Sequence, residues 1–119
     1  LLARLEGEWD AEKVVRDGQE LPKFMLASGR RSAAKNEIKI SFGGQLIIHA
    51  LVRFDERTDP MHVDYFNLSG MFKGMIQLGI MQWRGDTACF CIAAPNQPRP
   101  TEFTGPAGSG RTLSHWRTK

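Results

Sequence analysis

Short alternating segments joined by tight turns are the feature that most constrains what this chain can fold into. Residues 37–42 alternate polar and apolar side chains, reach Gly43-Gly44, and are followed by a second run over 45–54. Two such runs separated by a glycine dipeptide are typical of a β-hairpin. No long segment has helical periodicity, so strands and tight turns must build the fold.

The same pattern continues along the chain. Strands are expected at 8–16, 37–42, 45–54, 62–68, 75–83, 87–94, 101–103 and 111–117, and a short helix at 23–27. Residues 30–36 are basic and polar and are expected to form a connection. Seven or eight strands with one short helix after the first predict an all-β protein, either an antiparallel up-and-down barrel or a sandwich.

Length and composition favour a single folded domain over residues 1–119. Hydrophobic residues make up 41% and charged residues 24% of the chain, as in ordinary globular proteins. The net charge of +3 invites a nucleic-acid interpretation, but basic and acidic residues are interspersed, and the one dense basic patch is Arg30-Arg31 with Lys23 and Lys35 nearby. We therefore expect a solvated surface and no nucleic-acid partner.

No signal-type segment or membrane-spanning stretch of roughly 20 apolar residues is predicted, and compartment and oligomeric state stay open. The two cysteines, Cys89 and Cys91, fall at i and i+2 of one predicted strand. That spacing places them too far apart for a disulfide and lacks the geometry of a zinc knuckle. They are predicted to be buried free thiols, with no metal site and no cofactor.

Three longer stretches carry a resemblance: "LEGEWDAEKVVRDGQELP", "FDERTDPMHVDY" and "GIMQWRGDTACFCIAAPNQPRPTEFTGPAGSGRTLSHWR". Together they resemble a lipocalin-like domain family of unknown function that is abundant in planctomycetes and related environmental bacteria. The likeness covers nearly the whole chain, and the best matches are Cys91, 99–103, 108–110 and 112–113. Residues 71–81 depart from it, because they are richer in methionine and glycine than the charged hairpin common in such domains.

The resemblance implies an eight-stranded calycin-type barrel. Gly7-x-Trp9 resembles the short lipocalin signature, in which the tryptophan plugs the closed end and a basic residue of the last strand packs across it. The resemblance places Arg117 in that role, with Arg111 as the competing candidate. It carries over no catalytic residues.

A barrel of about eight strands either fills its interior with side chains or holds one small ligand. The candidate lining residues are Met25, Leu46, Ile48, Val52, Phe54, Val63, Tyr65, Met75 and Met81. An enclosed apolar space of roughly 300 Å³ or more would favour a ligand.

Other candidate sites have simpler explanations. His62 and Asp64 share a strand face and are conceivable as an acid–base pair, but exposed neighbours suffice. The glycine-rich segment 105–110 lacks the helix that a nucleophile elbow or a phosphate loop would feed. Residues 99–103 form a stiff proline-flanked loop that either closes the barrel edge or docks a partner.

The sequence thus predicts a non-enzymatic binding domain that holds an apolar or amphipathic small molecule in the barrel mouth. The alternative is a structural or protein-interaction module with a filled barrel. An enzyme is not expected, because no acid, base or nucleophile set converges.

Overall fold

The computed structural model describes residues 2–119, with the backbone alone at residue 2. Its elements, in chain order, are α1 (Leu2–Leu5), β1 (Gly7–Arg16), β2 (Gln19–Glu20), α2 (Lys23–Leu26), β3 (Arg30–Ala34), β4 (Glu37–Phe42), β5 (Gln45–Asp55), β6 (Met61–Asn67), β7 (Ile76–Arg84), β8 (Thr87–Ile92) and β9 (Thr112–Thr118).

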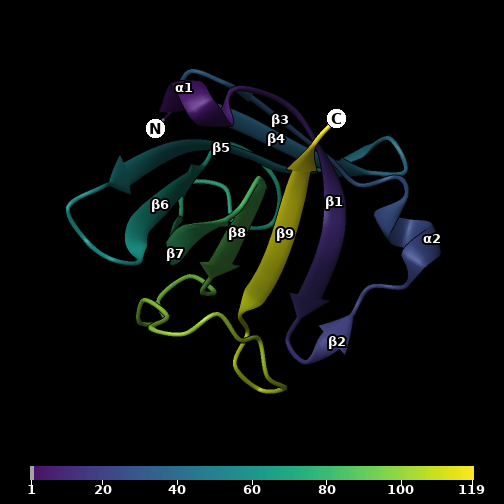
Figure 1. Cartoon of the computed structure of the whole chain (residues 1–119). Helices are drawn as coiled ribbons and strands as arrows, with labels where there is room; N and C mark the ends of the chain where they lie inside the picture. The colour runs from purple at the N-terminus through teal and green to yellow at the C-terminus, as the bar shows by residue number, and fades with distance from the viewer. Residues whose placement is uncertain (1) are drawn as a thin grey trace.

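Each strand pairs antiparallel with its neighbour, in the order β1-β3-β4-β5-β6-β7-β8-β9, and β9 pairs back onto β1 (Figure 1). Within the described residues, eight strands therefore close into an up-and-down barrel, and the two-residue β2 extends one edge of β1. The predicted all-β barrel is confirmed. Closure leaves no long free edge on the ring of strands.

Local turn chemistry explains the hairpins. Gly43 and Gly44 have φ angles of 59° and 81°, so both central residues of the β4–β5 turn lie in the left-handed region. A two-residue turn of this kind matches the twist of the flanking strands, and glycine adopts it without a steric penalty. The helix predicted at 23–27 is present as α2, one residue shorter at its end.

The basic stretch at 30–36 is not a connection, because most of it forms β3. This strand pairs with β1 through Trp9↔Arg31 and with β4 through Arg31↔Ile40. The alternation of inward and outward residues is present, but an arginine occupies an inward position and hides the apolar pattern. The prediction of a strand at 101–103 is also wrong, because this segment is an irregular loop.

The loop between β8 and β9 folds back over the outside of the sheet instead of extending into solvent. Its Phe103 packs against a second small core made by Ile80, Cys91 and Leu113. Arg99 donates hydrogen bonds to backbone carbonyls of β6 and β7, and Pro100 is buried. These contacts give the proline-flanked loop a structural role.

One end of the barrel is closed by α1 and aromatic side chains. Leu5 and Trp9 are each 2% exposed, and the indole Nε1 of Trp9 donates to the Leu5 carbonyl at 2.9 Å. Trp83 lies beside Trp9, with ring centroids 5.9 Å apart, and the guanidinium of Arg4 stacks 3.6 Å over Trp83. Trp9 therefore plugs this end, as the signature implies. The two helices of the described chain, at four residues each, are far too short to cross a bilayer.

Candidate functional site

An arginine side chain lies inside the barrel. Arg31 on β3 is directly opposite Trp9 and Ile40, and both of those residues belong to the main core. Residues opposite one another in an antiparallel pair share a face, so Arg31 points inward as well. Its residue is 1% exposed, and its guanidinium carbon lies 4.9 Å from the centroid of the Phe90 ring, on the far wall formed by β8.

A tyrosine is the other ionisable side chain at this place. Tyr65, the single tyrosine of the chain, lies on the inner face of β6 and is 3% exposed. Burial lowers the pKa of Arg31 and raises the pKa of Tyr65, and each group partly opposes the change in the other. The phenol and the guanidinium therefore lie close together in the same low-dielectric space.

The Arg31 guanidinium has no carboxylate partner among the described residues. By strict geometry none of its three buried nitrogens completes a hydrogen bond, although the Tyr65 hydroxyl lies close enough to support the positive charge. The one other buried side-chain atom of this kind in residues 2–119, Asp10 Oδ1, lies 3.3 Å from Arg30 Nε on the outside of the barrel. Arg31 is thus the exception in an otherwise compensated structure.

Neighbouring polar groups inside the barrel are satisfied. Trp116 Nε1 donates to Ser114 Oγ at 2.9 Å. Asn67 Nδ2 donates to Gln77 Oε1 at 3.1 Å, and Gln77 Nε2 donates to the Ala93 carbonyl at 3.1 Å. The fold can pair polar atoms at these positions, so the unpaired arginine is a local feature of one place in the interior.

A cation in such a setting strongly prefers an anion nearby. Removing an unpaired charge from water costs several kcal/mol, whereas its contact with one aromatic face returns at most about 2 kcal/mol. The planar guanidinium offers two parallel N–H donors that match a carboxylate, and the Tyr65 hydroxyl can donate a third hydrogen bond. Chemically, the arrangement is an anion-binding group in aromatic surroundings.

Six of the predicted lining residues face the interior: Ile48, Val52, Phe54, Val63, Tyr65 and Met81. Leu46 does not, because a β-bulge after Ile40 shifts the register, and it is 48% exposed. Met75 precedes β7 and is 43% exposed, and Met25 lies on α2, outside the strands of the barrel. For Leu46 and Met75, strand alternation was extended past the point where the strand or its register ends, and for Met25 the short helix was expected to cover the barrel mouth.

Buried apolar side chains pack against one another in the interior of the barrel. Two depressions among the described residues, of about 390 and 470 Å³, are open and lined by charged groups of the outer surface. One lies between β1 and β9, around Glu12 and Arg117; the other lies beside the β5–β6 turn, around Asp55 and His62. Neither is the enclosed apolar space that would favour a bulky ligand.

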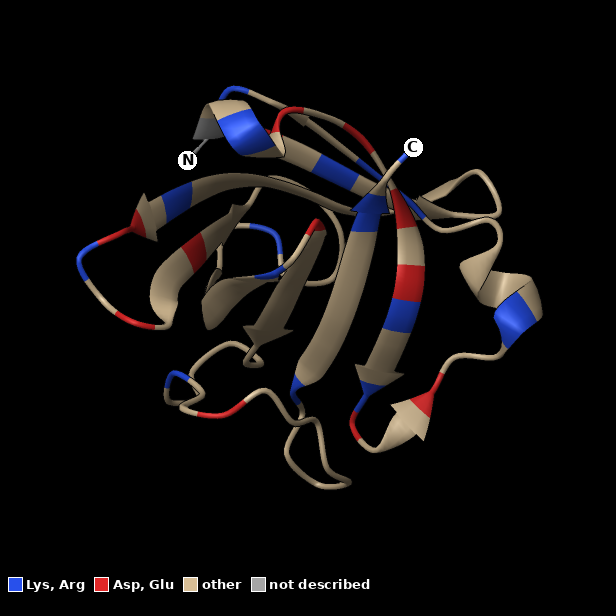
Figure 2. Ribbon diagram, viewed as in Figure 1, with Lys and Arg blue, Asp and Glu red and all other residues tan. Residues whose placement is uncertain are grey.

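The prediction that Arg117 packs across Trp9 is wrong. Figure 2 shows acidic and basic residues in close succession along β1, and there Glu12 Oε2 lies 3.1 Å from Arg117 Nε. The Arg117 side chain is 69% exposed on the outer face, so it cannot stack on the inward indole. Arg4 of α1 instead provides the cation at this end, through Trp83. Gly7 has a φ of 111°, which explains why glycine begins the strand.

The remaining candidates do not converge. Cys89 and Cys91 are buried free thiols, as predicted, and burial raises the pKa of each. Among residues 2–119, no group of His, Cys, Asp and Glu side chains is arranged to hold a metal ion. Asp64 Oδ1 lies 2.7 Å from Arg99 Nη2, so this carboxylate holds the β8–β9 loop. His62 lies beside it on the outer surface.

Sequence reasoning missed Arg31 because it counted the residue as part of a solvated basic patch. The one available signal was the spacing of Arg31 and Ala33, which alternate with Ser32 and Ala34 as a short strand would. Comparison with protein-family models, curated proteins and solved structures gives no match for this chain. The resemblance to the lipocalin-like family therefore stays a prediction.

Proposed function

We propose that this protein is a non-enzymatic binding barrel for a small molecule that carries one carboxylate and an apolar body. The observation that carries the proposal is the enclosed, unpaired guanidinium of Arg31. Departures from local optimality of this kind tend to mark functional sites, because a structure under selection for stability alone would remove them.

The site favours a single negative charge. Arg31 supplies one positive charge and Tyr65 one neutral donor, and the walls around them are aromatic and aliphatic. A monoanionic carboxylate would balance this charge, whereas a dianionic phosphate would leave a net negative charge buried. Because the interior is packed, the apolar body of the ligand has to be small or has to displace side chains at the end opposite α1.

The test is a thermal-shift and calorimetric titration with straight-chain carboxylates of increasing length, each matched by the alcohol of the same length. The carboxylates should raise the melting temperature and the alcohols should not. A ligand at 100 times its Kd stabilises the folded state by about 2.7 kcal/mol.

Variants make the test specific. Arg31→Met should abolish the response to carboxylates, and Tyr65→Phe should weaken binding by roughly tenfold, as expected for one lost hydrogen bond to a charged group. Arg53→Met is the matched control, because this side chain is 85% exposed on the outer face of β5. The proposal fails if no carboxylate shifts the wild-type protein, or if Arg31→Met responds as the wild type does.

The alternative from the sequence, a filled barrel that acts as an interaction module, rests on a different observation. The packed interior is compatible with this alternative, and one outer surface carries several exposed apolar side chains.

A further inference from the structure

Exposed apolar side chains gather on one outer region of the barrel, which we call the β5–β7 apolar surface. It consists of Leu46, Ile47, Phe66, Met71, Met75 and Ile76, each between 43% and 85% exposed. Phe66 and Ile76 are directly paired across β6 and β7, and the Leu68 amide donates to the His49 carbonyl of β5 at 2.8 Å. The members are therefore neighbours in space, although they come from three segments of the chain.

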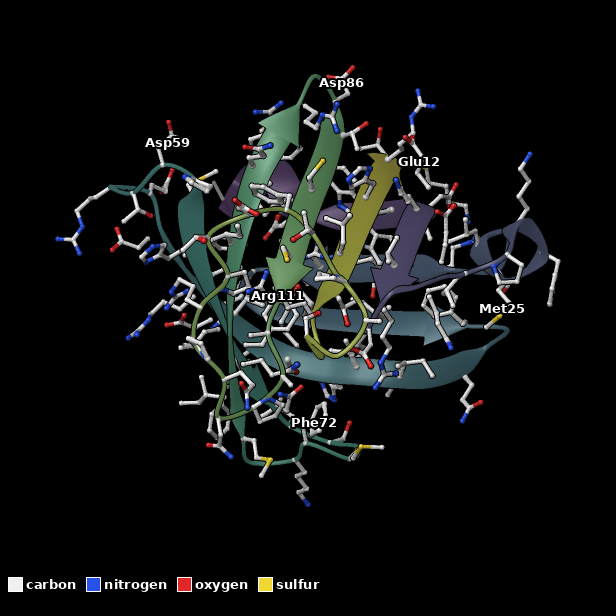
Figure 3. The ribbon with its side chains drawn as sticks, turned by 90° about the horizontal axis from the view of Figure 1, so that it is seen from below. Glu12, Met25, Asp59, Phe72, Asp86 and Arg111 are labelled. Atoms are coloured by element: carbon white, nitrogen blue, oxygen red, sulfur yellow. The ribbon has the colours of Figure 1, made fainter. Side chains whose placement is uncertain are left out.

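The loop that carries Met71 and Met75 is held in shape. The Lys73 amide donates to the Gly70 carbonyl, the Met75 amide to the Phe72 carbonyl, and the Gly74 amide to the Asn67 carbonyl. In Figure 3 the part of the chain that carries Phe72 projects from the edge of the molecule. The fold thus presents apolar side chains outward on an ordered backbone.

The charges around this surface have one sign. Residues 65–85, which include the loop and β7, contain Lys73 in the loop and no aspartate or glutamate, whereas Arg84 lies at the opposite end of β7. Residues 38–54 contain no acidic residue, and Lys39 lies opposite His49, whereas Arg53 lies towards the other end of β5. The nearest carboxylates on the adjoining strands are already engaged: Asp64 bonds Arg99 and Arg53, and Glu37 bonds His49.

We infer that the β5–β7 apolar surface docks on an anionic lipid membrane. Burying exposed methionine, phenylalanine and isoleucine side chains in the interfacial region of a bilayer provides the hydrophobic contribution. Lysine and arginine near an anionic membrane surface add an attraction that salt screens. A second copy of this chain fits less well, because it would bring two surfaces of the same positive sign together.

The experiment is co-sedimentation of the protein with vesicles of phosphatidylcholine alone and of phosphatidylcholine with 30% phosphatidylserine, a composition on the order of anionic cell leaflets. Binding should favour the anionic vesicles by roughly tenfold at low salt and weaken as salt rises. The double variant Met71→Ser, Met75→Ser should bind roughly tenfold more weakly, and Lys73→Glu should lose the preference for anionic vesicles.

Phe24→Ser is the matched control, because Phe24 is 78% exposed on α2, which packs beside β1 and contributes no member of this surface. It should bind as the wild type does. Melting temperatures of all variants should stay within a few degrees, since the substituted side chains are on the surface. The inference is overturned if the wild type does not bind anionic vesicles, if Phe24→Ser loses binding equally, or if the double variant abolishes a concentration-dependent dimer instead of vesicle binding.

Discussion

Replacing the enclosed arginine by an apolar residue of similar length tests the physical basis of the proposed site. In the absence of ligand, Arg31→Met removes a buried charge that no carboxylate of the described residues neutralises. Exchanging buried charged groups for apolar side chains of similar volume is often neutral or stabilising by about 1–4 kcal/mol. The contact with the Phe90 ring is lost as well, which reduces the gain by about 0.5–2 kcal/mol.

Subtracting the lost contact from the gain leaves an effect between about 1 kcal/mol of destabilisation and about 3.5 kcal/mol of stabilisation, centred near 1 kcal/mol of stabilisation. For a chain of 119 residues, an unfolding entropy of about 2.1 cal/mol/K per residue converts 1 kcal/mol into about 4 °C. The melting temperature should therefore rise by about 4 °C at the centre of this range and by at most about 14 °C. Few single substitutions increase stability by this amount, so the direction of the change is the informative result.

The assay is thermal unfolding followed by circular dichroism, in a buffer free of carboxylates and phosphate. Arg53→Met provides the control and should change stability by less than about 0.5 kcal/mol, because its side chain is exposed. A loss of 3–5 kcal/mol in Arg31→Met would refute the reasoning, since that is the cost of breaking a buried ion pair. Such a result would mean that the guanidinium is already compensated within the folded chain.

Three further predictions concern the outer surface and the thiols. In urea unfolding, Arg99→Ala should destabilise the protein by about 2–3 kcal/mol and Arg53→Ala by less than about 1 kcal/mol. Both side chains contact Asp64, but only Arg99 is largely buried. Equal effects of the two substitutions would contradict this explanation. Hydrogen bonds from Arg57 hold the pKa of Asp55 at about 2. The stabilisation by this contact is therefore fully present above the ordinary pKa of 3.8 and is lost as the pH falls through about 2. Carbon NMR of the Asp55 carboxyl should give this midpoint, and Arg57→Ala should return it towards 3.8. Burial raises the pKa of both cysteines. A thiol reagent at pH 8 should therefore label them slowly in the native protein and rapidly in urea. Fast labelling of the native protein would show that strand β8 opens.

The sequence predicts the strands and turns because their signals are local, whereas these signals left a barrel and a sandwich open and the resemblance implied the barrel. The glycine dipeptide between 42 and 45 and the alternation over 37–42 depend only on neighbouring residues and fix one hairpin. The proline-flanked segment 99–103 was expected to form a strand in part, but its conformation depends on distant partners. Arg99 bonds carbonyls of β6 and β7, which are remote in sequence, and no local pattern encodes that contact.

By itself, the sequence determined the all-β class and the hairpin turns, since each follows from turn chemistry or side-chain periodicity. The burial of Trp9 was expected from the resemblance of Gly7-x-Trp9 to the lipocalin signature. Only the tertiary structure decided that Arg31 crosses the interior to Phe90 and lies near Tyr65. In the sequence, an arginine that faces inward cannot be distinguished from a surface arginine, because the interior exists only after the sheet has closed. The physical reason is that strand alternation sets which residues share a face, whereas pairing of β1 with β9 sets what that face meets.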